Sequence, residues 1–464
     1  MESPFFSPAA RAVAFIQFAW TQSVVATKPG AARRFFITIG FFLFAFSNIA
    51  FTAEAPLTLT EAQRRAVERS RQIPAQDAAI AASRNMAVAA GQLPDPQLRF
   101  GIDNLPVDGP DQFSVGRDFM TQRRIGISQE FTRSEKRQLR AQRYEREAEK
   151  SLAEKTAIIA TIQRQTALAW FDRYYAEAMA AVIAEQAGEV KLEISAAESA
   201  YRAGRGTQAD VFAAHSALAG LEDRASEFRR RIDTARIGLT RWIGDGADTL
   251  LEGKPAIDSI ALDSSSLESE LGHHPQIAIL SKQVEVAAIE AGIAQAETKA
   301  DWTVELAYSQ RGGAFSNMVS IGVSIPLQWD QKNRQDRELA SRLATADRAR
   351  AERDDVLRAH VAEVSTMVHE WQNNLERTAR FQDRLIPLAR ERTKAALGAY
   401  VGNKASLTDL LLARRSEIDV RLQALQLEME AARSWAQLNF LFPDGAGATH
   451  TRATSNAPAT REAQ

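Results

Sequence analysis

Apolar residues recur at alternating steps of three and four positions along two stretches of the chain. One stretch contains Val361, Val364, Val368, Trp371 and Leu375. The other contains Ile418, Leu422, Leu425, Met429, Ala432 and Ala436. These steps place the apolar side chains on one face of an α-helix, and they are typical of both a coiled-coil seam and the core of a helical bundle. We therefore predict long helices packed side by side.

Between the helical stretches, apolar and polar residues alternate with the two-residue period of a β-strand. The alternation covers residues 302–310 and 318–327, and it returns more weakly in 97–103 and 123–131. It predicts four strands with one apolar face and one small or polar face. A soluble sheet with one wet face has the same pattern, so alternation alone leaves its surroundings open.

The chain also contains an internal duplication. The matched positions are Pro74 and Gly91 with Pro275 and Gly292, Ile125-Gly126-Ile127-Ser128 and Lys136 with Ile321-Gly322-Val323-Ser324 and Lys332, and Tyr201 and Asp210 with Tyr400 and Asp409. The three blocks keep their order, at offsets of 201, 196 and 199 positions. Chance can produce one such pair, but three blocks in order indicate two copies of one unit.

Each half has the same predicted order of helix, strand, strand, long helix and helix. The predicted ranges are 60–91, 97–103, 123–131, 134–203 and 207–243 in the first half, and 272–299, 302–310, 318–327, 333–401 and 405–442 in the second. A helix of about 70 residues is roughly 105 Å long and needs partners along its whole length. The two shorter helices of each half together have about that length, so we expect them to lie end to end beside the long one.

The predicted organisation is an N-terminal extension with a signal peptide (1–53), a first repeat (54–244), a linker (245–266), a second repeat (267–443) and a disordered tail (444–464). Arg33 and Arg34 precede an apolar run and then small residues, which is the order of a secretory signal cleaved near Ala53. The run is shorter than the about 20 residues of a membrane span. An uncleaved anchor is the alternative.

Composition limits the chemistry. The 57 Lys and Arg residues nearly balance the 58 Asp and Glu residues, which argues against nucleic acid as a partner because phosphates require a basic face. The chain has no Cys, so disulfides, thiolate metal sites and cysteine nucleophiles are excluded. The six His residues lack the spacing found in zinc hydrolases. We predict no catalytic residue, no metal ligand and no cofactor, and therefore a protein that is not an enzyme.

Strands of about 9 to 10 residues with one apolar face suit an outer-membrane β-barrel. The residues predicted to face lipid are Trp302, Val304, Leu306, Tyr308, Ile321, Val323 and Ile325. Those predicted to face a water-filled lumen are Glu130, Glu305, Ser320 and Ser324. Four strands cannot close a barrel of about eight or more, so subunits would have to share it.

These features resemble the TolC-type outer-membrane factor family over about residues 57–443. The resemblance rests on the duplicated order of elements, on the Ile-Gly-Xaa-Ser strands, and on two segments, Ala200-Tyr201-Arg202-Ala203-Gly204 through Asp210 and Ala399-Tyr400-Val401-Gly402 through Asp409. Residues 91–98, 104–106 and 125–131 resemble the branch that works with heavy-metal resistance-nodulation-division pumps. Some members of that branch carry a lipidated Cys, which this chain lacks.

The resemblance implies a mainly α fold with a small β part. Three chains would form a homotrimer with a shared transmembrane β-barrel, four strands from each chain, and a long α-helical coiled-coil barrel in the periplasm. It also implies that the hairpin turns form a periplasmic tip for adaptor docking. The residues expected there are Tyr201, Gly204, Arg205, Gly206, Asp210, Tyr400, Gly402, Asn403, Lys404 and Asp409.

Several roles stay open at this tip. Asp210 and Asp409 either line a closed entrance or are ordinary solvated charges, and the two Tyr residues either pack or gate. Away from the tip, Pro387 is expected to kink the second long helix, and its repeat equivalent is Gly188, which also weakens a helix.

The implied function is a passive exit duct in the outer membrane for heavy-metal cations. Its implied partners are outer-membrane lipid, a periplasmic adaptor (a membrane fusion protein) and an inner-membrane resistance-nodulation-division pump. The same duct serving drugs or type I protein secretion is one alternative. A soluble periplasmic coiled-coil adaptor or scaffold is an alternative of another class.

Overall fold

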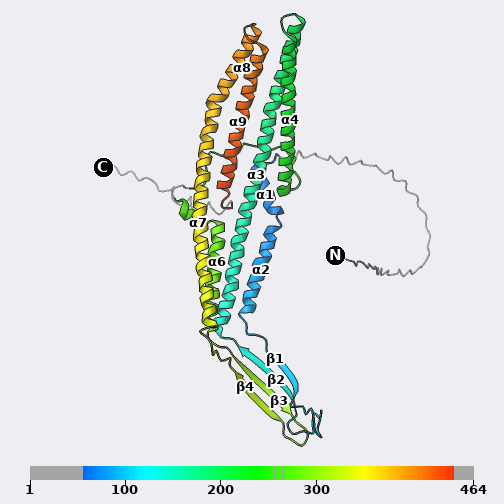
Figure 1. Cartoon of the computed structure of the whole chain (residues 1–464), viewed down its shortest axis with the longest axis vertical. Coiled ribbons are helices and arrows are strands. Elements are labelled where there is room, and N and C mark those ends of the chain that lie inside the picture. Colours follow the sequence, from blue (N-terminus) through cyan, green and yellow to red (C-terminus); the bar gives the residue numbers. More distant parts are fainter. Residues whose placement is uncertain (1–55, 255, 263–265, 444–464) are drawn as a thin grey trace, which may run out of the picture. The chain divides into compact units, whose positions relative to one another are not determined.

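A computed structural model describes residues 56–254, 256–262 and 266–443 of the chain. The signal peptide predicted within residues 1–53 and the tail predicted at 444–464 lie outside these residues. Within the described part, each half contains helices and two strands in the same order, and the four strands form one sheet (Figure 1). None of these helices is both long enough and apolar enough to cross a membrane.

The first half is organised around one helix of 69 residues, α3 (Ser134–Arg202). At 1.5 Å per residue it is about 100 Å long. Two helices pack along different stretches of it, α2 (Gln72–Ala90) and α4 (Gln208–Ile243) (Figure 1). A short helix, α1 (Leu59–Arg69), contacts both α3 and α4. The expected end-to-end arrangement beside the long helix is therefore confirmed for this half.

The single helix predicted over 60–91 is wrong in one respect, because it is divided between α1 and α2. Ser70 ends α1 with an extended backbone, and its hydroxyl accepts a hydrogen bond from the Gln72 N–H at 3.2 Å. Serine competes in this way with the helical hydrogen-bond pattern.

The second half repeats the arrangement with one interruption. After the short α5 (Leu267–Leu271), α6 (Pro275–Glu297) and α9 (Leu407–Asn439) pack along α7 (Gln335–Arg380). A π-helical turn, η1 (Phe381–Leu385), joins α7 to α8 (Ile386–Val401). Pro387 is the second residue of α8. Because proline has no N–H and its ring clashes with the carbonyl four residues earlier, a widened turn accommodates it.

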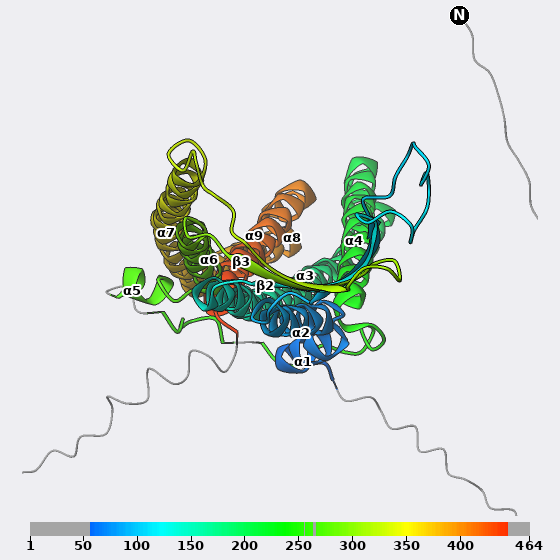
Figure 2. The same cartoon turned by 90° about the horizontal axis from the view of Figure 1, so that it is seen from below.

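Four antiparallel strands form one sheet in the order β1-β2-β3-β4. They are β1 (Gln97–Asp103), β2 (Gln122–Phe131), β3 (Trp302–Gln310) and β4 (Met318–Ser324). The central pair, β2 with β3, joins the two halves of the chain. Seen from below, the strands curve across under the helices, with α4 and α7 toward the two flanks (Figure 2).

The last strand is shorter than predicted, because β4 ends at Ser324 instead of continuing to residue 327. Pro326 follows closely and cannot donate a ladder hydrogen bond. Ile325, which was predicted to face lipid as part of this strand, therefore lies just beyond its end. Its side chain is exposed.

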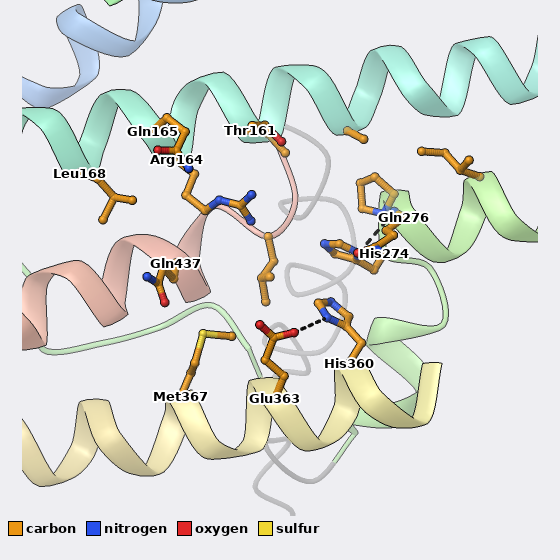
Figure 3. Close-up of a pocket in the computed structure, with 15 residues that line it drawn as sticks. Thr161, Arg164, Gln165, Leu168, His274, Gln276, His360, Glu363, Met367 and Gln437 are labelled. Carbon is orange, nitrogen blue, oxygen red and sulfur yellow. Dashed lines mark hydrogen bonds and ion pairs between the residues drawn. The ribbon is translucent and has the colours of Figure 1, made fainter. Parts of the chain in front are cut away.

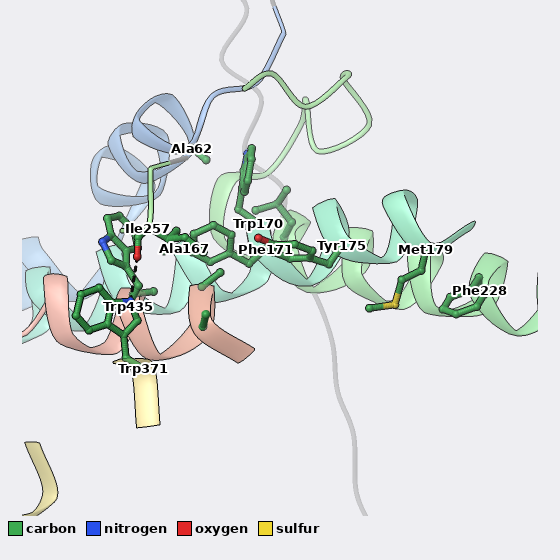
Figure 4. Packing of buried hydrophobic residues seen from close by; sticks show 14 of the residues in the cluster. Ala62, Ala167, Trp170, Phe171, Tyr175, Met179, Phe228, Ile257, Trp371 and Trp435 are labelled. Atoms are coloured by element: carbon green, nitrogen blue, oxygen red, sulfur yellow. Dashed lines mark hydrogen bonds between the residues drawn. The ribbon is translucent and has the colours of Figure 1, made fainter. Parts of the chain in front are cut away.

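The largest buried side chains belong to an aromatic cluster on α3 and its partners (Figure 4). Trp170, Phe171 and Tyr175 are almost completely buried, and Trp435 packs edge-on against Phe171. The seam residues predicted from 361–375 and 418–436 all contribute to this core or pack against it. The helical periodicity therefore identified the buried faces of α7 and α9 correctly.

Three tryptophans hold extended segments against the helices. The Trp170 indole N–H donates to the Leu57 carbonyl at 3.2 Å, and Leu57 also pairs with Leu250. The Trp371 and Trp435 indoles donate to the carbonyls of Ile257 and Ser259 at 2.9 and 2.7 Å. These parts of the 245–266 segment, which the sequence indicated as a linker, are thus fastened to the helical core.

Candidate functional site: the hairpin turns and the sheet

The α3–α4 turn is built by glycine. α3 ends near Ala203, and Gly204 follows with a φ of 72°, in the left-handed region that glycine adopts without strain. The N–H groups of Arg205 and Gly206 both bond to the Ala200 carbonyl, at 2.9 and 3.2 Å. This closes the end of α3 and reverses the chain into α4.

The α8–α9 turn reaches the same geometry with a different residue. Asn403 has a φ of 57°, and asparagine is one of the few residues other than glycine that tolerate it. The Lys404 N–H bonds to the Ala399 carbonyl at 2.8 Å, as Arg205 does to Ala200 in the first turn. Gly402, one of the residues expected at the tip, ends the helix with a negative φ.

Both turns lead into capping boxes with the same pattern of hydrogen bonds. Thr207 caps α4: its hydroxyl accepts from the Asp210 N–H, and the Asp210 carboxylate accepts from the Thr207 N–H at 2.9 Å. Ser406 and Asp409 repeat these bonds at the start of α9, with 3.1 Å for the Ser406 N–H. Each Asp therefore satisfies a backbone donor at a helix N-terminus.

The two predicted tip tyrosines differ in their surroundings. Tyr201 is half exposed, whereas Tyr400 packs against the hydrophobic core. Burial raises the pKa of the Tyr400 phenol, and the nearby carboxylates of Asp210 and Glu193 raise it further. Repeat-related positions thus have different environments, which the sequence did not indicate.

A buried ion pair links the two hairpins below the turns. Arg414 of α9 donates to Glu193 of α3 at 2.7 Å and to Gln186 at 3.1 Å. Burial raises the pKa of Glu193, and Arg414 opposes that rise. Because α3 belongs to the first half and α9 to the second, this pair fixes how the hairpins lie together. Its signal in the sequence is only a charged residue on an otherwise apolar helix face.

The strand register gives the sheet one continuous apolar face. Ile127 lies between Leu98 and Leu306, and Leu306 faces Ile321. The predicted lipid-facing residues of β3 and β4, namely Trp302, Val304, Leu306, Tyr308, Ile321 and Val323, all share this face. Most of its large side chains are exposed. An exposed apolar surface of this kind marks an interaction site for protein or membrane.

The opposite face carries small and charged residues, including the predicted Glu130, Glu305, Ser320 and Ser324. The two carboxylates have different partners. Glu305 bonds to Arg124 of β2 at 2.7 Å and lies 3.9 Å from Arg99 of β1. Glu130 accepts a hydrogen bond from the hydroxyl of Thr132. Arg99 and Arg124 therefore partly neutralise this face. Their alternation with Leu98 and Ile125 places them on it, but their pairing with Glu305 was not predicted from the sequence.

In the described part of the chain, no group of three or more His, Asp or Glu residues could hold a metal ion. The candidate site therefore consists of surfaces rather than a chemical centre: two capped hairpin turns at one end of the long helices and a two-faced sheet at the other (Figure 1).

No protein-family model and no curated protein matches the chain. Several solved structures match its fold. The outer-membrane channel OprN has 17% sequence identity and a TM-score of 0.70, over 83% of this chain and 90% of that one. The outer membrane protein VceC from Vibrio cholerae has 20% identity and a TM-score of 0.68, over 82% and 95%.

CusC, whose structures concern transmembrane channel formation, has 13% identity and a TM-score of 0.70, over 83% of this chain and 92% of that one. The fold of this chain is therefore the fold of these outer-membrane proteins. The shared region includes nearly all of their length, so the likeness extends over both the helices and the sheet.

Proposed function

We propose that the protein is the outer-membrane channel subunit of a tripartite efflux system and acts as a passive exit duct. The observation that carries this proposal is the pairing of an exposed, one-sided apolar sheet with helices of about 100 Å. The apolar face would meet outer-membrane lipid, and the opposite face would line a water-filled lumen. Three copies would contribute four strands each to one closed sheet.

The capped hairpin turns are the proposed docking points for a periplasmic adaptor. Their two capping boxes hold Asp210 and Asp409 in equivalent positions, and Arg205 and Lys404 are exposed in the turns. An inner-membrane resistance-nodulation-division pump would supply the energy. If the two Asp residues also close the entrance, replacing both with Ala should raise single-channel conductance in lipid bilayers.

Heavy-metal cations are the proposed cargo, on the strength of the sequence resemblance to the metal-efflux branch. The ion pairs of Glu305 leave less free negative charge on the polar face than the carboxylates alone would supply. Selectivity would therefore belong mainly to the pump, with only a modest contribution from this chain.

Membrane fractionation tests the channel against a soluble adaptor or scaffold. The channel should remain in the outer-membrane fraction after a high-salt wash and should leave it only with detergent. Release by salt alone would contradict the proposal, because an embedded apolar sheet is not held by ionic contacts.

A deletion strain tests the cargo. We expect sensitivity to particular ions among copper, silver, zinc, cobalt, cadmium and nickel, and unchanged tolerance of a detergent and a dye. The reverse pattern would retain the duct but assign it to a drug pump. A loss of protein secretion without either sensitivity would assign it to type I secretion.

A further inference from the structure

A cavity of about 530 Å³ lies between α3, the start of α6, α7 and the end of α9, far along the chain from the hairpin turns and the sheet. We call it the His274–His360 cavity. Figure 3 shows the Arg164 side chain extending from α3 toward side chains of α7, with His274 beside them. Polar groups from both halves of the chain therefore converge on one space.

Arg164 lacks a protein partner among the described residues: no hydrogen bond or ion pair joins its guanidinium to a described group. Burial lowers its pKa, and the charge of Glu363 only partly offsets this effect. Partly buried guanidinium groups normally bind a carboxylate or phosphate in a two-pronged fashion. An unpaired guanidinium at a cavity wall is thus a vacant binding group for an anion.

His360 is the second unpaired group. Its side chain is 10% exposed, and its Nε2 has no hydrogen-bond partner within the described structure. Its other nitrogen, Nδ1, lies 3.5 Å from the Glu363 carboxylate. When His360 is protonated, Glu363 supports the charge on one side, and Nε2–H is left to donate to a ligand on the other.

His274 shapes the site without being free to bind. Its Nδ1 accepts the Gln276 N–H at 3.3 Å and so caps α6. Its ring centroid is 4.4 Å from that of His360. Burial, the adjacent His360 and Arg164 lower its pKa to about 4. A neutral His274 therefore leaves Arg164 as the positive group of the described lining and Glu363 as its one negative group, with His360 Nε2 as a further unpaired atom.

We propose that the His274–His360 cavity binds a small oxyanion carrying a carboxylate or phosphate group, held by the Arg164 guanidinium and by His360 Nε2–H. A cation is disfavoured because Arg164 repels it and because the His274 lone pair is engaged. Gln437 of α9 also lines the cavity, so the ligand would bridge α3 with the second half of the chain.

Calorimetric titration of the purified full chain in detergent tests this inference. Sodium phosphate and sodium succinate are titrated separately, against sodium chloride at the same ionic strength. We expect one saturable site per chain for at least one oxyanion, and the anion that binds identifies the group recognised.

Variants distinguish anion binding in the cavity from a general effect of positive charge on the protein. Arg164→Gln and His360→Gln should each weaken binding at least about tenfold, because each removes a charge-assisted hydrogen bond, and Arg164→Lys should retain part of it. Arg358→Gln is the matched control, because Arg358 lies on the same helix as His360 but is exposed and pairs with Asp355. It should bind like the unchanged chain.

Three results would overturn the inference. One is the absence of saturable binding of either oxyanion above chloride. Another is unchanged binding in Arg164→Gln, whose folding is checked by thermal unfolding without ligand and is expected to match that of the unchanged chain. The third is saturable binding of Zn²⁺ alone that Arg164→Gln strengthens, which would make the cavity a metal site.

Discussion

Gly126 of β2 lies opposite Ala307 of β3. A Cβ at this position would lie 3.0 Å from the Cβ of Ala307 and 3.2 Å from the Leu306 carbonyl oxygen. We therefore expect Gly126→Val to push the central strands apart and to lower the free energy of unfolding by about 1–3 kcal/mol, the usual cost of overpacking. Urea unfolding of the purified protein, followed by circular dichroism, measures this change.

Gly322 supplies the matched control. It occupies the same place in the repeated Ile-Gly-Xaa-Ser pattern, yet nothing lies within 4 Å of a Cβ built on it. Gly322→Val should leave the unfolding of a single chain nearly unchanged. Equal losses in both variants would mean that the glycines serve strand flexibility and that the close approach at Ala307 does not matter.

Asp409 makes the start of α9 sensitive to acid. The Ser406 hydroxyl and N–H both donate to its carboxylate and lower its pKa. A lowered pKa in the folded chain means that the carboxylate stabilises the cap fully above the ordinary aspartate range near pH 4 and loses this effect as the pH falls through the lowered value. Hydrogen exchange in the first turn of α9, corrected for intrinsic rates, should therefore accelerate only at such acidic pH.

Asp409→Ala should reproduce this faster exchange at neutral pH, because it removes the acceptor for the Ser406 N–H. Asp347→Ala is the control, since Asp347 pairs with Arg350 on the exposed surface of α7. If exchange at the α9 turn stays slow in Asp409→Ala, the capping box is not what orders the turn.

At the scale of elements, the spacing of hydrophobic residues and the residues that end helices and strands predicted most of the architecture. The helix expected over 134–203 is α3, and the strands expected over 97–103 and 302–310 have those bounds. Such segments are long or strictly alternating, so tertiary contacts do not change their type. The break at Ser70 was missed because a single hydroxyl, bonded to the backbone two residues on, decides it.

The π-helical turn before Pro387 allows a test of what sets the register between α7 and α8. A π-helical turn contains about one residue more than a regular helical turn, so it shifts the register of α8 relative to α7. Deleting Asp383 should be strongly destabilising in the unchanged chain, because a regular helix would bring Pro387 against a carbonyl. In a Pro387→Ala background, the same deletion should cost about 3 kcal/mol less, since that clash is gone.

Thermal and urea unfolding of the four chains (unchanged, each single change, and both) measure this coupling. Pro387→Ala alone is expected to keep the π-helical turn, because α8 already packs against α9 in its present register. An additive result, with no difference between the two backgrounds, would show that proline is not the cause of the widened turn.

At the scale of the whole molecule, the candidate site could be predicted only in part. The two faces of the sheet could be predicted from the alternation within each strand. The positions of the hairpin turns could be predicted from Gly204 and Gly402 and from the repeated Asp210 and Asp409. The partners of Glu305 could not be predicted, because Arg99 and Arg124 meet it only through the register of three strands. The cavity around Arg164 has no sequence signal either, since its residues come from four separate segments.

Adjacent residues of β4 test whether the whole sheet has the proposed orientation. Val323 lies on the apolar face and Ser324 on the opposite one, so their side chains would meet lipid and lumen, respectively. Val323→Arg should then reduce the amount of assembled trimer in outer-membrane extracts, at a cost below the about 2–4 kcal/mol of an arginine at mid-membrane, because Val323 lies near the end of β4. Ser324→Arg places the same charge one residue away and should assemble nearly normally. If instead Ser324→Arg blocks assembly and Val323→Arg does not, the apolar face would point inward and would be covered by protein rather than by lipid.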